Sequence, residues 1–91
     1  MSHTPQSELA PKIEVAKKFV EINGIYYHYK LGKEFPYKVL VLALLEANEE
    51  IAVVYAAQYG DHLVWVRPLS SWLSEVETEA GKVKRFIKVK P

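Results

Sequence analysis

Residues 55–76 read YAAQYGDHLVWVRPLSSWLSEV, and this stretch decides the fold. Residues 51–59 alternate with a period of two, which predicts a strand that leads into it. Gly60-Asp61 predicts a tight hairpin turn, because glycine reaches positive φ and aspartate can bond its own backbone. Residues 63–66 then form the second strand, which Pro68 ends. A serine at position 70 or 71 caps a helical turn that we expect to continue to residue 76.

Three further strands flank this hairpin. We expect them over residues 25–31, 37–45 and 83–89, with loops at 32–36, 46–50 and 77–81. The first and the last alternate, and the first is rich in tyrosine, as half-buried strands are. Residues 37–45 form a continuous apolar run, which predicts a strand covered on both faces.

The N-terminal part of the chain consists of a polar segment followed by an amphipathic one. Residues 1–10 are polar and predict a disordered tail. Residues 11–23 predict an amphipathic helix, since their charged side chains recur at helical spacing and Asn23-Gly24 suits a helix end. Residues 19–22 include β-branched side chains, so an extended arm is the alternative. The helix is the spare apolar element that can cover the 37–45 strand.

Length and composition restrict the class of protein. Ninety-one residues fit one domain, and the apolar fraction of 49% suits a globular core. The chain has no cysteine, which excludes a disulfide scaffold and a thiolate zinc site. A net charge of +1 gives no general attraction to nucleic acid or membrane. Without a signal peptide or a membrane-spanning run, we expect a soluble cytoplasmic protein without a membrane partner.

These elements together predict a mainly β, small α+β fold. The expected architecture is an SH3-like, partly open antiparallel barrel of four or five strands over residues 24–90. A short helical turn precedes the last strand, and the amphipathic helix precedes the barrel. The alternative is a twisted sheet with one helix packed across it.

Several segments resemble a small bacterial domain, the domain of unknown function 1653. The segments that carry the resemblance are YHYK at 27–30, YKVL at 37–40, VY at 54–55, YGD at 59–61, LVWVRPL at 63–69, LSEV at 73–76 and KRF at 84–86. The resemblance covers roughly residues 24–89, and WVRPL with the preceding YGD is its most specific part. It implies a compact β domain and brings no catalytic residues and no function.

An aromatic face that contains arginine is the leading candidate site. Its residues are Tyr59, Asp61, Trp65 and Arg67, with Tyr29 and His28. Aromatic rings can stack nucleobases, and the arginine fork binds phosphate or carboxylate. We therefore expect a non-enzymatic binding module for nucleic acid or a nucleotide-like small molecule. In the alternative, the rings pack in the core, and Arg67 ties the fold together by pairing with Asp61, Glu75 or Glu77. We expect about half of the rings to be in the core, which leaves room for an exposed aromatic face.

Trp65 and Arg67 share one face of their strand by alternation. If this face is exposed, Trp65 can stack a planar group while Arg67 meets its negative charge. We expect Trp65 to be largely buried instead, with the N-terminal helix covering Val64 and Val66 on the other face.

Basic residues near the C-terminus form a second candidate site. Lys84, Arg85 and Lys88 could make a patch for phosphates. The alternative is a solvated edge strand on which lysines discourage aggregation.

The sequence contains no motif for an enzyme. A glycine-rich phosphate loop and the zinc-protease and serine-hydrolase motifs are all missing. We therefore expect no catalytic residues, no metal and no cofactor. An acid–base pair of His28 with Asp61 or Glu75 requires that folding bring them together. The second function class is a protein-interaction or structural domain that acts through an edge strand or helix contacts. The oligomeric state is left open.

Overall fold

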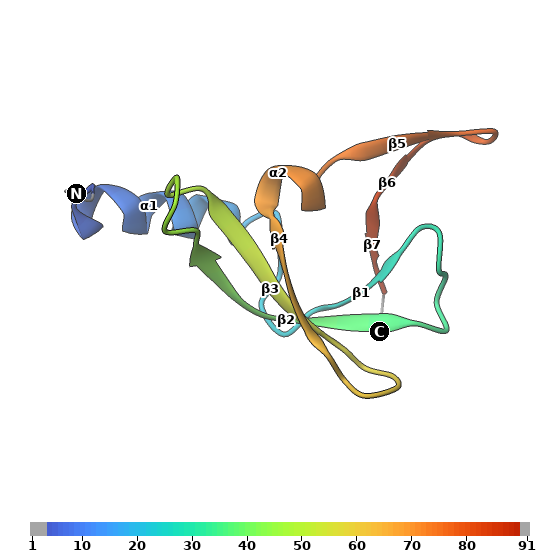
Figure 1. The fold of residues 1–91 in the computed structure, drawn as a ribbon. Helices are drawn as coiled ribbons and strands as arrows, with labels where there is room; N and C mark the ends of the chain where they lie inside the picture. The colour runs from blue at the N-terminus through green and yellow to red at the C-terminus, as the bar shows by residue number, and fades with distance from the viewer. Residues whose placement is uncertain (1–3, 90–91) are drawn as a thin grey trace.

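The computed structural model describes residues 4–89, which contain two helices and seven strands (Figure 1). The elements are α1 (Gln6–Ala16), β1 (Ile25–His28), β2 (Pro36–Leu44), β3 (Ile51–Ala57), β4 (Val64–Pro68), α2 (Leu69–Trp72), β5 (Glu75–Thr78), β6 (Gly81–Lys84) and β7 (Phe86–Lys88). No helix in this range is long and apolar enough to cross a membrane. The predicted mainly β, small α+β fold is confirmed.

Five strands form one antiparallel sheet in the order β4-β3-β2-β1-β7. The hairpin at Gly60-Asp61 joins β3 to β4 as predicted, and both Gly60 and His62 have positive φ. β4 and β7 are the two edges of the sheet and do not pair, so the expected barrel is not closed. The reason is that the chain leaves the sheet after α2, and only Phe86–Lys88 remain to pair with β1.

Residues 75–84 form a separate two-stranded hairpin, where the sequence predicted the end of a helical turn, a loop and the start of the 83–89 strand. That predicted strand is divided at Arg85 into the end of β6 and β7. Glu75 lies opposite Lys84 and Glu77 lies opposite Lys82, so opposite charges face each other across the two strands. Gly81 has a φ of 105° at the turn. The acidic residues of β5 thus lie opposite the basic residues of β6, an arrangement that favours the pairing of the two strands.

The N-terminal helix lies earlier in the chain than predicted. It covers Gln6–Ala16 instead of 11–23, so Pro11 lies inside it and part of the expected tail is helical. Residues 1–3 of that tail lie outside the described residues. Thr4 anchors this end, because its backbone N and its Oγ1 donate to the Glu49 carboxylate at 2.9 Å and 2.7 Å. After Ala16 the chain turns, and Val20 enters the core.

The expectation that residues 37–45 are covered on both faces is wrong. The register of β2 against β3 shifts between Val39 and Val41, and Leu40 and Val41 are exposed. α1 does not lie across this strand, because its apolar residues meet Leu44 near the end of β2. A β-bulge therefore accounts for the missing alternation.

Aromatic rings dominate the core. The fully or nearly buried cluster contains Ala16, Val20, Tyr26, Tyr37, Val39, Leu42, Val53, Tyr55, Ala57, Trp72 and Phe86. Trp72 stacks on Phe86 with ring centroids 3.9 Å apart and planes within 5°, so α2 is fastened to β7 across the sheet. Phe86, one of the two stacked rings, also lines the candidate site described below.

The molecule is elongated for its size. Its radius of gyration is 14.3 Å, whereas a compact domain of this length has about 12 Å. α1 and the β5–β6 hairpin extend from the sheet on opposite sides (Figure 1).

Candidate functional site

A cleft of about 250 Å³ opens on the sheet face that carries Tyr55 and Arg67. Its lining residues are His28, Lys30, Leu31, Tyr37, Tyr55, Arg67 and Phe86, and we call it the arginine cleft. None of these side chains is acidic. Ligand pockets usually begin at about 300 Å³, so the arginine cleft suits a small ligand or one group of a larger ligand.

Arg67 is held in place by neutral and aromatic partners. Its Nη1 donates to Ser71 Oγ at 2.9 Å, and its guanidinium carbon lies 5.1 Å from the centre of the Phe86 ring. Trp72 covers one face of that ring, so the guanidinium lies over the other. Within residues 4–89 no carboxylate lies within ion-pair distance of Arg67. The alternative pairing with an acidic residue is therefore not formed.

Arg85, between β6 and β7, contacts the residues that follow α2. Its Nε donates to Ser74 Oγ at 2.9 Å, and the Ser74 hydroxyl donates in turn to the Ser71 carbonyl at 2.6 Å. Arg67 and Arg85 are the only two arginines in the sequence. Both are thus oriented by serine hydroxyls three residues apart, and these hydroxyls leave the two positive charges uncompensated.

The electrostatic surroundings of His28 report this excess of positive charge. Burial, followed by the charges of Arg67, Arg85 and Lys30, lowers the pKa of His28 below its ordinary value of 6.5. His28 Nδ1 accepts a hydrogen bond from the Lys30 backbone N at 3.2 Å. Its ring packs edge-on against Phe86 at 5.1 Å. His28 is therefore neutral at neutral pH and stands where an added anion would favour its protonated form.

Binding of a divalent anion in the arginine cleft is expected to strengthen as the pH falls. Because the pKa of His28 is lowered, this histidine is unprotonated in the free protein. A bound anion would raise that pKa, so His28 would take up a proton when the anion binds. Sulfate affinity should therefore rise between about pH 8 and pH 5. Calorimetry with sulfate measures this, since sulfate keeps its own charge over the range.

Two histidine variants separate this effect from general acid effects. His28→Gln should flatten the pH dependence, whereas His62→Gln, at an exposed turn position, should preserve it. An unchanged pH profile in His28→Gln would contradict the role of His28. Without an anion, the stability of the fold changes with pH in the opposite direction. Because the pKa of His28 is lower in the folded than in the unfolded chain, the fold becomes less stable as the pH falls below the pKa of the unfolded state.

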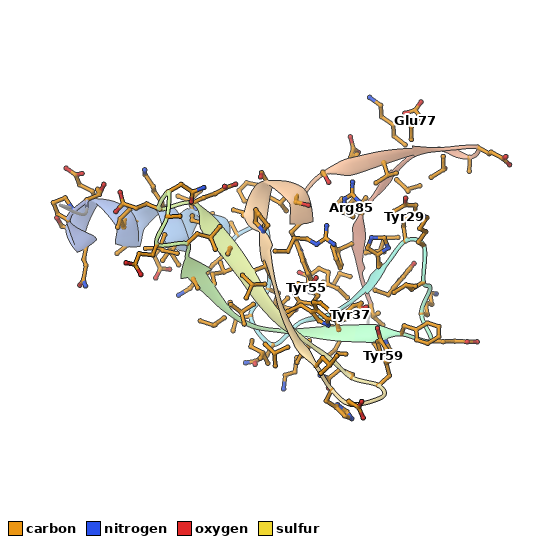
Figure 2. All side chains as sticks on the ribbon, viewed as in Figure 1. Tyr29, Tyr37, Tyr55, Tyr59, Glu77 and Arg85 are labelled. Atoms are coloured by element: carbon orange, nitrogen blue, oxygen red, sulfur yellow. The ribbon has the colours of Figure 1, made fainter. Side chains whose placement is uncertain are left out.

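Tyr37 and Tyr55 line the arginine cleft, and Tyr59 packs edge-on against Tyr37 next to it (Figure 2). The Tyr37 and Tyr59 hydroxyls are 2.6 Å apart, and burial together with this bond raises the pKa of Tyr37 to about 12. The Tyr55 hydroxyl has no hydrogen-bond partner in residues 4–89 and is not enclosed. Tyr55 itself lines the arginine cleft.

Trp65 lies on the same face as Tyr55 but is 50% exposed, so the expectation that it is buried is wrong. It pairs with Tyr55 across the β3–β4 ladder, and directly paired residues of antiparallel strands share a face. β4 is an edge strand and α1 packs near Leu44 instead, so nothing in the described residues covers Trp65. The exposed case, with Trp65 beside Arg67, is the one that the structure shows.

Of the remaining predicted residues, Tyr29 lies next to His28, whereas Asp61 and Glu75 lie on other segments. Tyr29 packs against His28 with ring centroids 4.8 Å apart, and its backbone N donates to the Arg85 carbonyl at 3.0 Å. Asp61 lies in the exposed β3–β4 turn, at the opposite end of β4 from Arg67, and does not line the cleft. Glu75, the other proposed acid partner of His28, lies on the β5–β6 hairpin.

The three residues of the predicted basic patch point to different partners. Lys88 Nζ forms an ion pair with Glu21 at 2.8 Å, and Lys84 lies opposite Glu75 in the hairpin. Arg85 turns toward Ser74, beside α2, and does not line the arginine cleft itself. Figure 2 shows Arg85 inside the angle between the sheet and the β5–β6 hairpin, with Glu77 far out on that hairpin.

Sequence reasoning missed the two serines that orient the arginines. Ser71 follows Arg67 by four residues, so their spacing was a local signal for a contact across the first turn of α2. Ser74 carried no such signal, because its partner Arg85 is eleven residues away across the hairpin.

Comparison with known proteins identifies relatives of the β domain. A family model described as "Protein of unknown function (DUF1653)" matches residues 24–88. A crystal structure of a protein belonging to DUF1653 from Bordetella bronchiseptica is similar, with 36% identity and a TM-score of 0.63, over 74% of this chain and 85% of that chain. No curated protein matches the chain. All residues that line the arginine cleft fall within the matched range, and α1 precedes it.

Proposed function

The chain belongs to the DUF1653 family, and from the arginine cleft and the side chains around it we propose that it is a non-enzymatic module that binds a nucleotide-like ligand. Such a ligand joins a planar group to a phosphate. The observation that carries the proposal is the convergence of both arginines on Ser71 and Ser74 without a carboxylate. Function has to be argued from this site, because a small β fold serves many functions.

The two arginines supply the phosphate-binding part. A guanidinium that donates one N–H to a serine keeps its other N–H groups for a ligand, and arginine forks match phosphate geometry. Arg67 is also fixed over the Phe86 ring, so little side-chain freedom is lost on binding. His28 can add a third positive charge when the anion is present.

Trp65 supplies the surface for the planar group. It lies two residues before Arg67 on the same face, which separates the two by about 7 Å along the strand. An exposed indole ring can stack a nucleobase, and such stacking tolerates any base. Tyr55, which lies directly opposite Trp65 in the ladder, lines the cleft together with Arg67.

We propose binding and not catalysis because His28 is surrounded by cations. A general acid–base pair needs a carboxylate or another orienting group at the histidine. Here the charges that act on His28 come from Arg67, Arg85 and Lys30. This arrangement favours holding an anion over moving a proton.

An NMR titration of the ¹⁵N-labelled chain tests the proposal. Adenosine monophosphate should shift the signals of Trp65, Arg67 and Arg85, whereas sulfate should shift only the arginine end and adenosine should bind more weakly. A short single-stranded oligonucleotide tests whether the natural ligand is a nucleic acid, which should then bind more tightly through the same residues. Shifts that are absent, or spread evenly over the chain, would refute the proposal.

A further inference from the structure

The edge strand β4 is the most exposed apolar segment of the sheet. Leu63, Val64, Trp65 and Val66 have exposed fractions of 56%, 58%, 50% and 56%. The charge and the proline of β4 lie at its end, at Arg67 and Pro68, so residues 63–66 contain neither. Natural proteins usually protect a strand edge with charges, proline or a covering element.

The other edge of the same sheet is protected in that way. β7 contains Lys88, which is ion-paired with Glu21, and it follows directly on Lys84 and Arg85. The β7 edge of the sheet is thus charged, whereas the first part of the β4 edge is apolar and exposed. The apolar first part of β4, which lacks these devices, is the part of the edge that is expected to meet a partner strand.

The backbone of β4 is complementary to itself. The Ala57 N donates to the Leu63 carbonyl at 2.9 Å, which fixes the phase of the β3–β4 ladder. In an antiparallel ladder, alternate residues bond the neighbour, so the N–H and C=O groups of Val64 and Val66 point outward. Val64 and Val66 lie one residue before and one residue after Trp65. Their outward N–H and C=O groups can therefore bond the same groups of an identical strand that runs in the opposite direction.

We propose that β4 pairs antiparallel with β4 of a second copy of this chain, about a two-fold axis at Trp65. Val64 of one copy then lies opposite Val66 of the other, and each such pair exchanges its backbone hydrogen bonds. The two five-stranded sheets become one continuous sheet. Both copies use the same surface, as a closed symmetric dimer requires.

Charge complementarity favours this orientation and this occupant. The turn before β4 carries exposed Asp61, and the end of β4 carries Arg67. Antiparallel pairing brings the acidic end of one copy beside the basic end of the other, whereas parallel pairing would bring like charges together. A five-residue strand is small beside the roughly 800 Å² per partner of a standard interface, so the dimer should be reversible, with a micromolar Kd.

Sedimentation over a range of concentrations tests the pairing. The wild-type chain should shift from monomer to dimer as the concentration rises. Val66→Pro should remain monomeric, because proline lacks the N–H that would bond the second copy. The fold should tolerate this change, since that N–H points outward and does not bond β3. Val66→Thr keeps that N–H and should still associate. Circular dichroism confirms that each variant is folded. A wild type that stays monomeric up to millimolar concentration, or a folded Val66→Pro that dimerises like the wild type, overturns the proposal.

Single cysteines test the register without depending on the proline variant, since the sequence has no cysteine. Residues at the axis form a non-hydrogen-bonded pair with Cα atoms about 4.5 Å apart, a distance that a disulfide spans. Trp65→Cys should therefore form a covalent dimer under mild oxidation. Val64→Cys, which is similarly exposed, should do so much more slowly, because Val64 lies opposite Val66. Equal rates, or faster cross-linking at position 64, overturn this register.

Discussion

Replacing Trp72 with alanine is expected to destabilise the fold by about 3–5 kcal/mol. Trp72 is 2% exposed, stacks on Phe86, and meets Tyr26 and Tyr55 edge-on at centroid distances of 5.3 Å and 4.9 Å. Its removal leaves a large cavity where α2 joins β7. Small domains have total stabilities of about 5–15 kcal/mol, so the variant should be largely unfolded or melt far below the wild type.

Urea unfolding measures this loss, and the second tryptophan provides a matched control. Trp65→Ala removes the same side chain from a half-exposed position, so it should cost much less stability and weaken nucleotide binding instead. Equal losses of stability in the two variants would show that the burial difference between Trp72 and Trp65 does not hold in solution.

Substituting Arg67 with lysine should weaken sulfate and nucleotide binding about 10- to 100-fold, because a charged hydrogen bond contributes about 1.5–3 kcal/mol. Lysine keeps the positive charge but lacks the planar fork and does not reproduce the contacts with Ser71 and the Phe86 ring. Calorimetry on the folded variant gives the affinity directly.

Two further variants test whether the fork is what matters. Ser71→Ala should weaken binding less than Arg67→Lys, since it removes only the hydroxyl that orients Arg67. Lys82→Ala, on the β5–β6 hairpin, should leave affinity unchanged if the effect is local. Full affinity in Arg67→Lys would mean that the cleft provides only a diffuse positive charge.

The sequence predicted those parts of the fold that local chemistry determines. Gly60-Asp61 between two apolar segments marked the β3–β4 hairpin, and the structure has it there. α1 was misplaced because its start depends on the Thr4–Glu49 contact, which spans 45 residues. Trp65 was expected to be buried because alternation identifies the faces of a strand but does not tell which strand is at the edge.

The candidate site, too, was predicted only in part from the sequence. Arg67 and His28 were selected from residue type, and the structure brings both into one cleft. Arg85 was assigned to a basic patch with Lys84 and Lys88, because the sequence did not reveal the β5–β6 hairpin that turns Arg85 back toward α2. The convergence of the two arginines is a product of that topology.

The β5–β6 hairpin has a consequence for how the molecule fluctuates. Its strands pair only with each other, and at its base the Arg85 backbone N donates to the Ser74 carbonyl at 3.0 Å. Such a segment can open locally, and expose its amides to hydrogen exchange, at a free energy well below that of global unfolding. The residues at this base are also those that orient Arg85 for an anion. A ligand held by Arg85 would therefore stabilise the closed hairpin by mass action, so amide protection some distance from the cleft would rise with occupancy.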